Sequence, residues 1–118
     1  MTTITALFIP ADTEAPTELR DIDADATLAA LQGAVGGLVE PVHLAKQRAD
    51  MYVNEEGKLL SLPVNVRATF LAGALGGILG WDQIAGDAII AGGVDEEGDT
   101  TGLDPLQVHE LHAALQQV

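Results

Sequence analysis

The fold is decided by the stretch Asp50-Met-Tyr-Val-Asn-Glu-Glu-Gly-Lys-Leu-Leu-Ser-Leu-Pro-Val-Asn-Val-Arg-Ala-Thr69. Its apolar residues predict a strand over 51–54 and a returning strand over 58–62. A turn joins them, in which Gly57 is expected to take a positive φ. Asn65 is then placed to cap the first turn of a helix. We therefore expect a β-hairpin that leads directly into a helix.

Together with the flanking sequence, the chain is expected to have three further strands and three helices, the second of which begins after Asn65. The expected strands span 4–9, 38–44 and 87–94; the expected helices follow an Asp25 N-cap up to Gly36, follow Asn65 over 66–75, and follow an Asp104 N-cap with Gln107 in a capping box. The predicted fold class is α+β, with a small, mostly antiparallel sheet of four to five strands packed against three helices. The 118 residues are expected to form one domain, 1–118.

Composition limits the classes of function. The formal net charge is −13, from 18 acidic and five basic residues, and apolar residues make up 47% of the chain. Five scattered bases cannot neutralise a phosphate backbone, so direct nucleic-acid binding and anionic membrane surfaces are disfavoured. The chain has no cysteine, and its first residues do not form a signal peptide. We expect a cytoplasmic protein.

Two segments hold 11 of the 18 acids. An acidic connector over 11–25 has six acids and one arginine, and an acidic loop over 95–104 has five acids and no base, so each carries a net charge of −5. Asp21, Asp23 and Asp25 have the spacing of a calcium loop, but Ala26 and Gln32 stand where glycine and glutamate are needed. The connector is therefore predicted to be a solvated segment without a metal site.

Asn54, Asn65 and Arg67 form the best candidate cluster for binding. If the strand and the first helical turn lie side by side, two amides and a guanidinium meet near a helix N-terminus, which suits an anion or a partner backbone. The structural alternative is that Asn65 caps, Asn54 ends a strand and Arg67 pairs with Glu55 or Glu56. Trp81, the single tryptophan, is expected to act as a lid over the core, with an exposed contact residue as the alternative.

Other chemical templates are incomplete. The acids Asp95, Glu96, Glu97 and Asp99 could hold a divalent cation, although a charged loop is usually just solvated. His109 and His112 share a helix face, but a zinc site needs a further ligand. No nucleophile elbow or phosphate-binding loop is present. We therefore assign no catalytic residue, no metal ligand and no cofactor.

The chain resembles the family called domain of unknown function 3846. The positions that carry the resemblance are Leu31-Gln32, Val35-Gly36-Gly37, Glu40, the string from Tyr52 to Lys58, Leu62-Pro63, Asn65, Arg67-Ala68-Thr69 and the segment 95–103. They cover roughly three quarters of the chain. The resemblance implies a small accessory protein of the type found in actinobacteria, their phages and mobile elements, with Tyr52 and the 50–69 stretch on a common surface. It carries no activity with it.

Two hypotheses of function follow. The first is a non-enzymatic interaction protein that binds a partner with a basic surface through the acidic loops or the 50–69 stretch; a nucleic-acid mimic is a sharper variant. The second is a small-ligand or divalent-metal-binding protein that uses Asn54, Asn65, Arg67 or the acids near Asp99. A homodimer is compatible with both.

Overall fold

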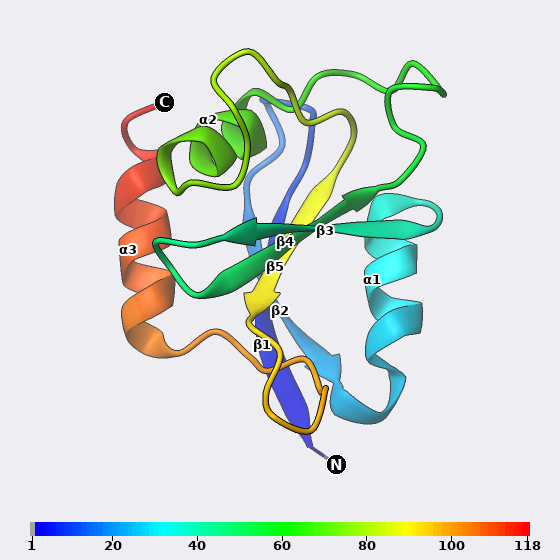
Figure 1. The fold of residues 1–118 in the computed structure, drawn as a ribbon, viewed down its shortest axis with the longest axis vertical. Coiled ribbons are helices and arrows are strands. Elements are labelled where there is room, and N and C mark those ends of the chain that lie inside the picture. Colours follow the sequence, from blue (N-terminus) through cyan, green and yellow to red (C-terminus); the bar gives the residue numbers. More distant parts are fainter. Residues whose placement is uncertain (1) are drawn as a thin grey trace.

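One five-stranded sheet runs through the molecule (Figure 1). The computed structural model describes residues 2–118. The strands are β1 (Thr3–Ile9), β2 (Glu18–Asp23), β3 (Val39–Leu44), β4 (Ala49–Asn54) and β5 (Ala88–Gly92). Their order is β2-β1-β5-β4-β3, and every pair is antiparallel. The late strand β5 therefore joins two hairpins, β1–β2 and β3–β4, into one sheet.

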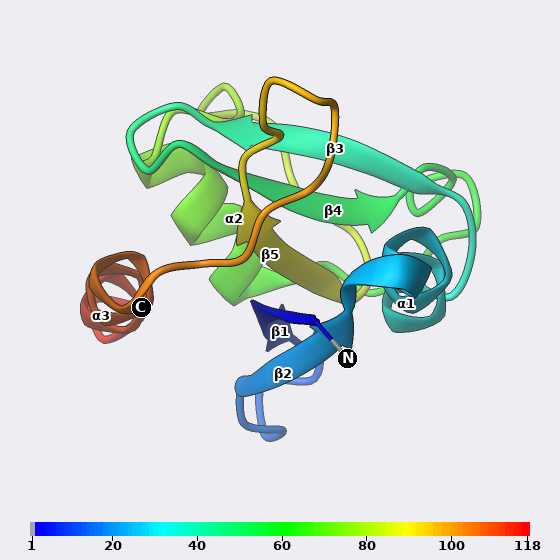
Figure 2. The same ribbon diagram turned by 90° about the horizontal axis from the view of Figure 1, so that it is seen from below.

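Helices cover both faces of this sheet (Figure 2). They are a 3-10 helix η1 (Ala24–Ala26), α1 (Thr27–Val35), α2 (Val66–Ala74) and α3 (Pro105–Leu115). α1 packs against one face, and α2 and α3 pack against the other. The predicted class, an antiparallel α+β fold with three helices, is confirmed. No helix within residues 2–118 has the length and apolar character needed to span a membrane.

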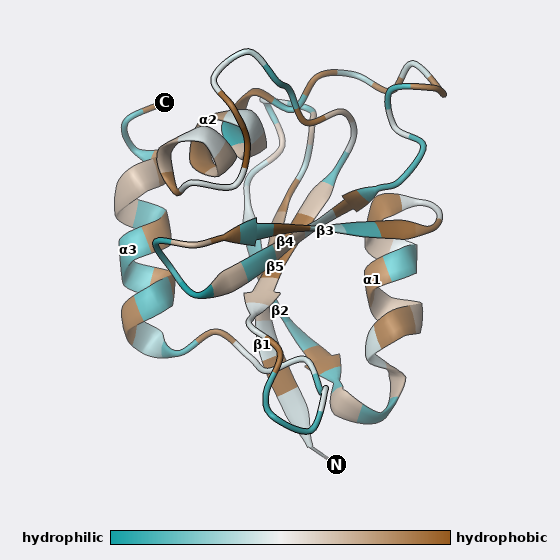
Figure 3. Cartoon of the chain, viewed as in Figure 1, coloured by the Kyte–Doolittle hydropathy of each residue, from teal (hydrophilic) through white to brown (hydrophobic). Residues whose placement is uncertain are grey.

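The two cores follow from the alternation of side chains along the strands, whose hydropathy is coloured residue by residue in Figure 3. In β4, Met51 and Val53 point to the face covered by α2 and α3, whereas Tyr52 points to the face covered by α1. In β5, Ile90 points to the face covered by α2 and α3, and Ile89 points to the face covered by α1. All five residues of this strand are buried. A strand that is buried on both faces reads as a continuous apolar run, which is why β5 was predictable.

The helix ends are formed largely as predicted. Gly36 ends α1 with φ 77°, Asn65 caps α2, and Asp104 forms a complete capping box with Gln107 on α3. The prediction that Asp25 caps the first helix was wrong. Asp23 instead accepts a hydrogen bond from the Asp25 N–H at 2.9 Å and caps η1.

The acidic connector was predicted without regular structure, and this was wrong for its second half. β2 pairs with β1 along its whole length, from Thr3↔Asp23 to Phe8↔Glu18. Only Ile22 is fully buried, because β2 is an edge strand with one face in solvent. The guanidinium of Arg20 covers the Phe8 ring at 3.8 Å from its centroid. Charged residues are common on such edges because they block pairing with other chains.

The predicted strand over 58–62 does not form. β4 already pairs with β3 on one side and β5 on the other, so the chain after Asn54 has no free edge to join. It coils into successive turns instead, and Ser61 adopts a left-handed φ of 55°. Gly57 has no positive φ. A Cβ there would lie 2.6 Å from the Ala85 carbonyl oxygen, so glycine is needed for close approach.

The segment 101–103 bridges the ends of two central strands. Gly92 of β5 donates its N–H to the Thr101 carbonyl at 2.8 Å, and Leu103 donates to the Thr5 carbonyl of β1 at 2.9 Å. A Cβ on Gly92 would lie 2.5 Å from the carbonyl oxygen of Gly102. The absence of a side chain at this position therefore lets the chain cross from β5 to α3.

Candidate binding site between two loops

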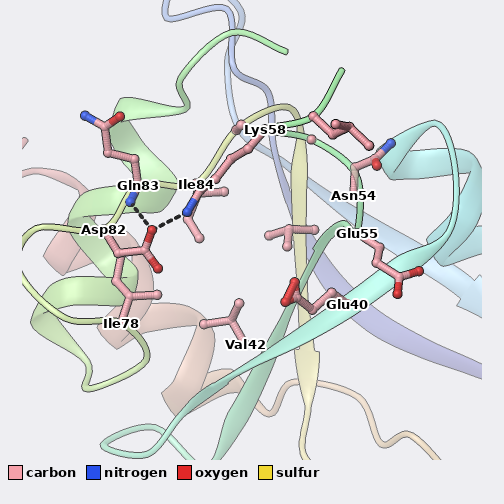
Figure 4. Close-up of a pocket in the computed structure, with 13 residues that line it drawn as sticks. Glu40, Val42, Asn54, Glu55, Lys58, Ile78, Asp82, Gln83 and Ile84 are labelled. Atoms are coloured by element: carbon pink, nitrogen blue, oxygen red, sulfur yellow. Dashed lines mark hydrogen bonds and ion pairs between the residues drawn. The ribbon is translucent and has the colours of Figure 1, made fainter. Parts of the chain in front are cut away.

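Two loops at one end of the sheet enclose a pocket of about 330 Å³ (Figure 4). One loop, 55–62, follows β4; the other, 78–85, follows α2. Apolar side chains of Val42, Val53, Ile78 and Ile84 form part of its lining, together with the charged residues Glu40, Glu55, Lys58 and Asp82. We call this cavity the loop pocket. It combines an apolar interior with a predominantly acidic rim.

The β3–β4 hairpin positions one side of the loop pocket. Glu40 lies opposite Val53 in the register of the two strands. The Asn54 side chain then turns the chain out of β4: its Oδ1 accepts the Glu56 N–H at 2.8 Å, and its Nδ2 donates to the Val35 carbonyl at 3.2 Å. Asn54 lines the pocket but is buried, and both of its amide atoms form hydrogen bonds that hold the loop in place.

An ion pair between Lys58 and Asp82 connects the two loops across the pocket. The hydrogen bond from Lys58 is the main cause that lowers the pKa of the Asp82 carboxyl, and the Gln83 N–H lowers it further, while desolvation acts in the opposite direction. A lowered pKa in the folded state means that this stabilising contribution is present above the unfolded-state pKa. It is lost as the pH falls through the folded-state pKa. The connection therefore persists at neutral pH.

The negative charge of the rim is not balanced. Lys58 is engaged by Asp82, and Glu40 and Glu55 lie on the opposite side of the pocket in Figure 4. Within residues 2–118, neither glutamate forms an ion pair. Three carboxylates against one ammonium leave a formal charge of −2 at the pocket. Such a site attracts a cationic group.

Large apolar side chains stand exposed on both loops. Trp81 is 80% exposed and Leu59 is 79% exposed, and Leu60 and Leu79 are also mostly in solvent. The interpretation of Trp81 as a lid was wrong, because the loop carries the indole away from the core. Leu59 lines the loop pocket, and Trp81 directly precedes the lining residue Asp82, so both side chains belong to the loops that border the pocket.

Asn65 was predicted as a binding residue, and the structure corrects this. It is completely buried. Its Oδ1 accepts the Ala68 N–H at 2.9 Å, and its Nδ2 donates to the Ile9 carbonyl at 2.9 Å and to the Gly86 carbonyl at 3.0 Å. The polar atoms of its side chain therefore all form hydrogen bonds within the protein, and they connect the start of α2 to the end of β1 and to Gly86.

Arg67 is also used by the fold. Its Nη2 donates to the carbonyls of Pro10 and Asp12, both at 2.9 Å. The predicted alternative, a pair with Glu55 or Glu56, is wrong. Arg67 forms hydrogen bonds with the segment that follows β1, whereas Asn54 forms one with the last residue of α1. The predicted cluster of Asn54, Asn65 and Arg67 therefore does not form a shared binding site.

The remaining predicted residues lie away from the loop pocket. Asp95 stabilises the conformation of its own loop, because its Oδ1 accepts hydrogen bonds from the N–H groups of Glu97 and Asp99, both at 2.9 Å. Tyr52 is buried beneath α1, yet it lines a second groove together with Asp99. Glu96, like Glu97, is exposed on the loop. In the part of the chain that the structure describes, no three His, Asp or Glu side chains are grouped to hold a metal ion.

Sequence reasoning did not group the residues that form the rim, although Glu55 was considered as a partner of Arg67. Glu40 was noticed only as part of the family resemblance, Asp82 was unassigned, and Lys58 was placed on a strand that does not form. The available signal was the alternation in β3, which puts Glu40 on the same face as Val42. The two loops come together only in three dimensions, through the bridge between Val64 and Ala85 and the close approach of Gly57 to Ala85.

Comparisons with known proteins give the chain a family and a fold neighbour. No curated protein matches the sequence. A solved structure with a similar fold is described as "Crystal structure of small RNA methyltransferase HEN1", with a TM-score of 0.59 and 18% sequence identity. The match covers 94% of this chain but only 16% of that chain, and at this identity it shows the fold alone. A family profile matches residues 4–116, nearly the full length, and the chain therefore belongs to the family described as "Domain of unknown function (DUF3846)".

Proposed function

We propose that this protein is a non-enzymatic interaction module that binds a segment of another protein in the loop pocket. The partner segment combines a lysine or arginine with a large apolar side chain. One observation carries the proposal: a cavity lined by aliphatic side chains and unbalanced carboxylates lies between two loops that hold Trp81 and Leu59 in solvent. The expected setting is the cytoplasm, as an accessory protein of the phage or mobile-element type.

The apolar part of the surface supplies affinity. A tryptophan side chain buries roughly 150–250 Å² when it is covered. At about 25 cal/mol per Å², covering Trp81 would contribute on the order of 4 kcal/mol before the costs of association. Tryptophan is also enriched among the residues that dominate binding energies. Trp81 is therefore the natural anchor of this interface.

The acidic part supplies selectivity. Glu40 and Glu55 line the pocket without cationic partners in residues 2–118, so a basic side chain from outside can pair with them. Attraction between opposite charges raises the association rate and is screened by salt, with a Debye length of about 10 Å at 0.1 M. The polar lining of the pocket consists of carboxylates, amides and one ammonium that Asp82 engages, which favours binding over catalysis.

Trp81→Ala is expected to abolish partner binding while leaving the fold intact. Because the indole is 80% exposed, its removal should change the free energy of unfolding by less than about 0.5 kcal/mol. The test is capture of proteins from a host lysate on the immobilised variant and on the wild type, with thermal unfolding as the stability measurement. Leu106→Ala is a matched control, because Leu106 is exposed on α3 and lines no part of the loop pocket.

The outcomes of this capture separate the hypotheses. A protein retained by the wild type and by Leu106→Ala, lost with Trp81→Ala and released by high salt supports the proposal. Equal retention by all three proteins would place the interface elsewhere, for example on the acidic segments in the manner of a nucleic-acid mimic. A large loss of stability in Trp81→Ala would contradict the exposed position of the indole.

A further inference from the structure

A second cavity, of about 590 Å³, lies on the opposite face of the sheet, and we call it the α1 groove. One wall is η1 with the start of α1, and the other is residues 98–100 of the acidic loop. In Figure 2 this loop, drawn in orange, crosses in front of β3 and β4, and α1 lies to its right. Leu28, Leu31 and Val39 supply aliphatic surface in the lining. The groove shares no lining residue with the loop pocket.

The hydroxyl of Tyr52 has no role in the fold. Tyr52 is only 7% exposed, and its ring packs with Leu31 and Ile89 in the core beneath α1. Its hydroxyl makes no hydrogen bond to another residue of the described chain, and the hydroxyl oxygen is not fully buried. Tyr52 is one of the residues that line the groove. A buried tyrosine normally finds a hydrogen-bond partner. The hydroxyl is therefore available to a ligand in the α1 groove.

Each wall of the groove also contributes a carboxylate that the fold does not use. Among residues 2–118, no hydrogen bond or ion pair uses the carboxylate of Asp25 or Asp99, whereas the backbone N–H groups of these two residues donate to the carboxylates of Asp23 and Asp95. No lysine or arginine lines the groove. The lining thus presents two free anions, one neutral hydroxyl and an aliphatic surface between them.

We propose that the α1 groove binds a small aliphatic diamine. The two ammonium groups pair with Asp25 and Asp99, the methylene chain lies against Leu28 and Val39, and the Tyr52 hydroxyl accepts a hydrogen bond from one ammonium. A bare divalent cation fits less well, because much of the lining is carbon and no group of three ligands is present among residues 2–118. This site is independent of the proposed protein-binding function.

The test is isothermal titration at low salt with 1,5-diaminopentane, with pentylamine, and with the amide of Nα-acetyl-lysine as the equivalent of a protein side chain. Because only the diamine can meet both walls, we expect it to bind at least about tenfold more tightly than either monoamine. Equal affinity for the three ligands, or no binding of the diamine at millimolar concentration, would overturn the proposal.

Variants locate the binding. Asp25→Asn and Asp99→Asn should each reduce diamine affinity to the level of pentylamine, and Glu97→Gln, in the same loop but outside the lining, should leave it unchanged. Tyr52→Phe should weaken binding severalfold without lowering the melting temperature, because the hydroxyl supports nothing in the fold. If the affinity for the diamine were unchanged in all three groove variants, the assignment of the α1 groove as its binding site would be wrong. Trp81→Ala should not change the affinity for the diamine. A negative result in this test can therefore be distinguished from a negative result in the test of the loop pocket.

Discussion

Replacing Asn65 with alanine is expected to lower the free energy of unfolding by about 4 kcal/mol, a large part of the 5–15 kcal/mol typical of a domain. Loss of an N-cap alone costs about 1 kcal/mol. The variant also leaves the carbonyls of Ile9 and Gly86 buried without their donor, at roughly 1–1.5 kcal/mol each, and it opens a small cavity. Denaturant unfolding of the purified variant measures the change.

Two further substitutions show which part of Asn65 matters. Asn65→Asp keeps the acceptor that caps Ala68 but replaces the donating amide with a carboxylate that faces two carbonyl oxygens, so it should destabilise at least as strongly as alanine. Asp104→Ala removes a solvent-exposed N-cap and should cost only about 1 kcal/mol. If Asn65→Ala cost no more than Asp104→Ala, the two buried donor bonds would contribute nothing and the account of Asn65 would be wrong.

Replacing Gly92 with alanine is expected to destabilise the protein by about 3 kcal/mol. The new Cβ would lie 2.5 Å from both the Gly102 carbonyl oxygen and the Thr101 hydroxyl oxygen, and 2.9 Å from the Thr101 carbonyl oxygen. Two of these three contacts are backbone atoms, so a side-chain rotation cannot relieve them. The segment must move and strain its bridge between β5 and β1, and overpacking of this kind costs about 1–3 kcal/mol or more.

Gly33→Ala is the matched control for this substitution. It makes the same chemical change within α1, where an added Cβ meets no atom within 4 Å. Since alanine is a better helix former than glycine, the variant should be more stable by up to about 1 kcal/mol. Thermal unfolding of both variants should therefore show shifts of opposite sign. A stable Gly92→Ala protein would show that the crossing segment is loosely packed.

The elements with strong local signals could be predicted from the sequence. The apolar run of β5, the Asn65 and Asp104 caps and the Gly36 terminator each depend on neighbouring residues alone. The choice of strands at the sheet edges does not. Residues 58–62 have side chains suited to a strand, but β4 has no free edge with which they could pair. The acidic residues 18–23 form a strand because they pair with the free edge of β1.

The binding residues were harder to predict, because the same polar groups serve the fold or a ligand according to their burial. Asn65 and Arg67 have the chemistry of an anion site, but backbone carbonyls from distant segments occupy them. Trp81 was interpreted as a lid over the core, with an exposed contact residue as the alternative, and the structure shows it in solvent. Tyr52 and Asp99 were both candidates, yet their meeting across one groove depends on tertiary structure.

The central claim is that the loop pocket binds a basic, apolar segment of a partner protein. Its most direct test is selection of a random displayed peptide library on the wild type and on the double variant Glu40→Gln, Glu55→Gln. We predict that the wild type enriches peptides that combine lysine or arginine with a large apolar residue, and that the double variant loses the preference for the basic residue. Peptides without a basic residue, or the same sequences enriched on both proteins, would contradict the claim.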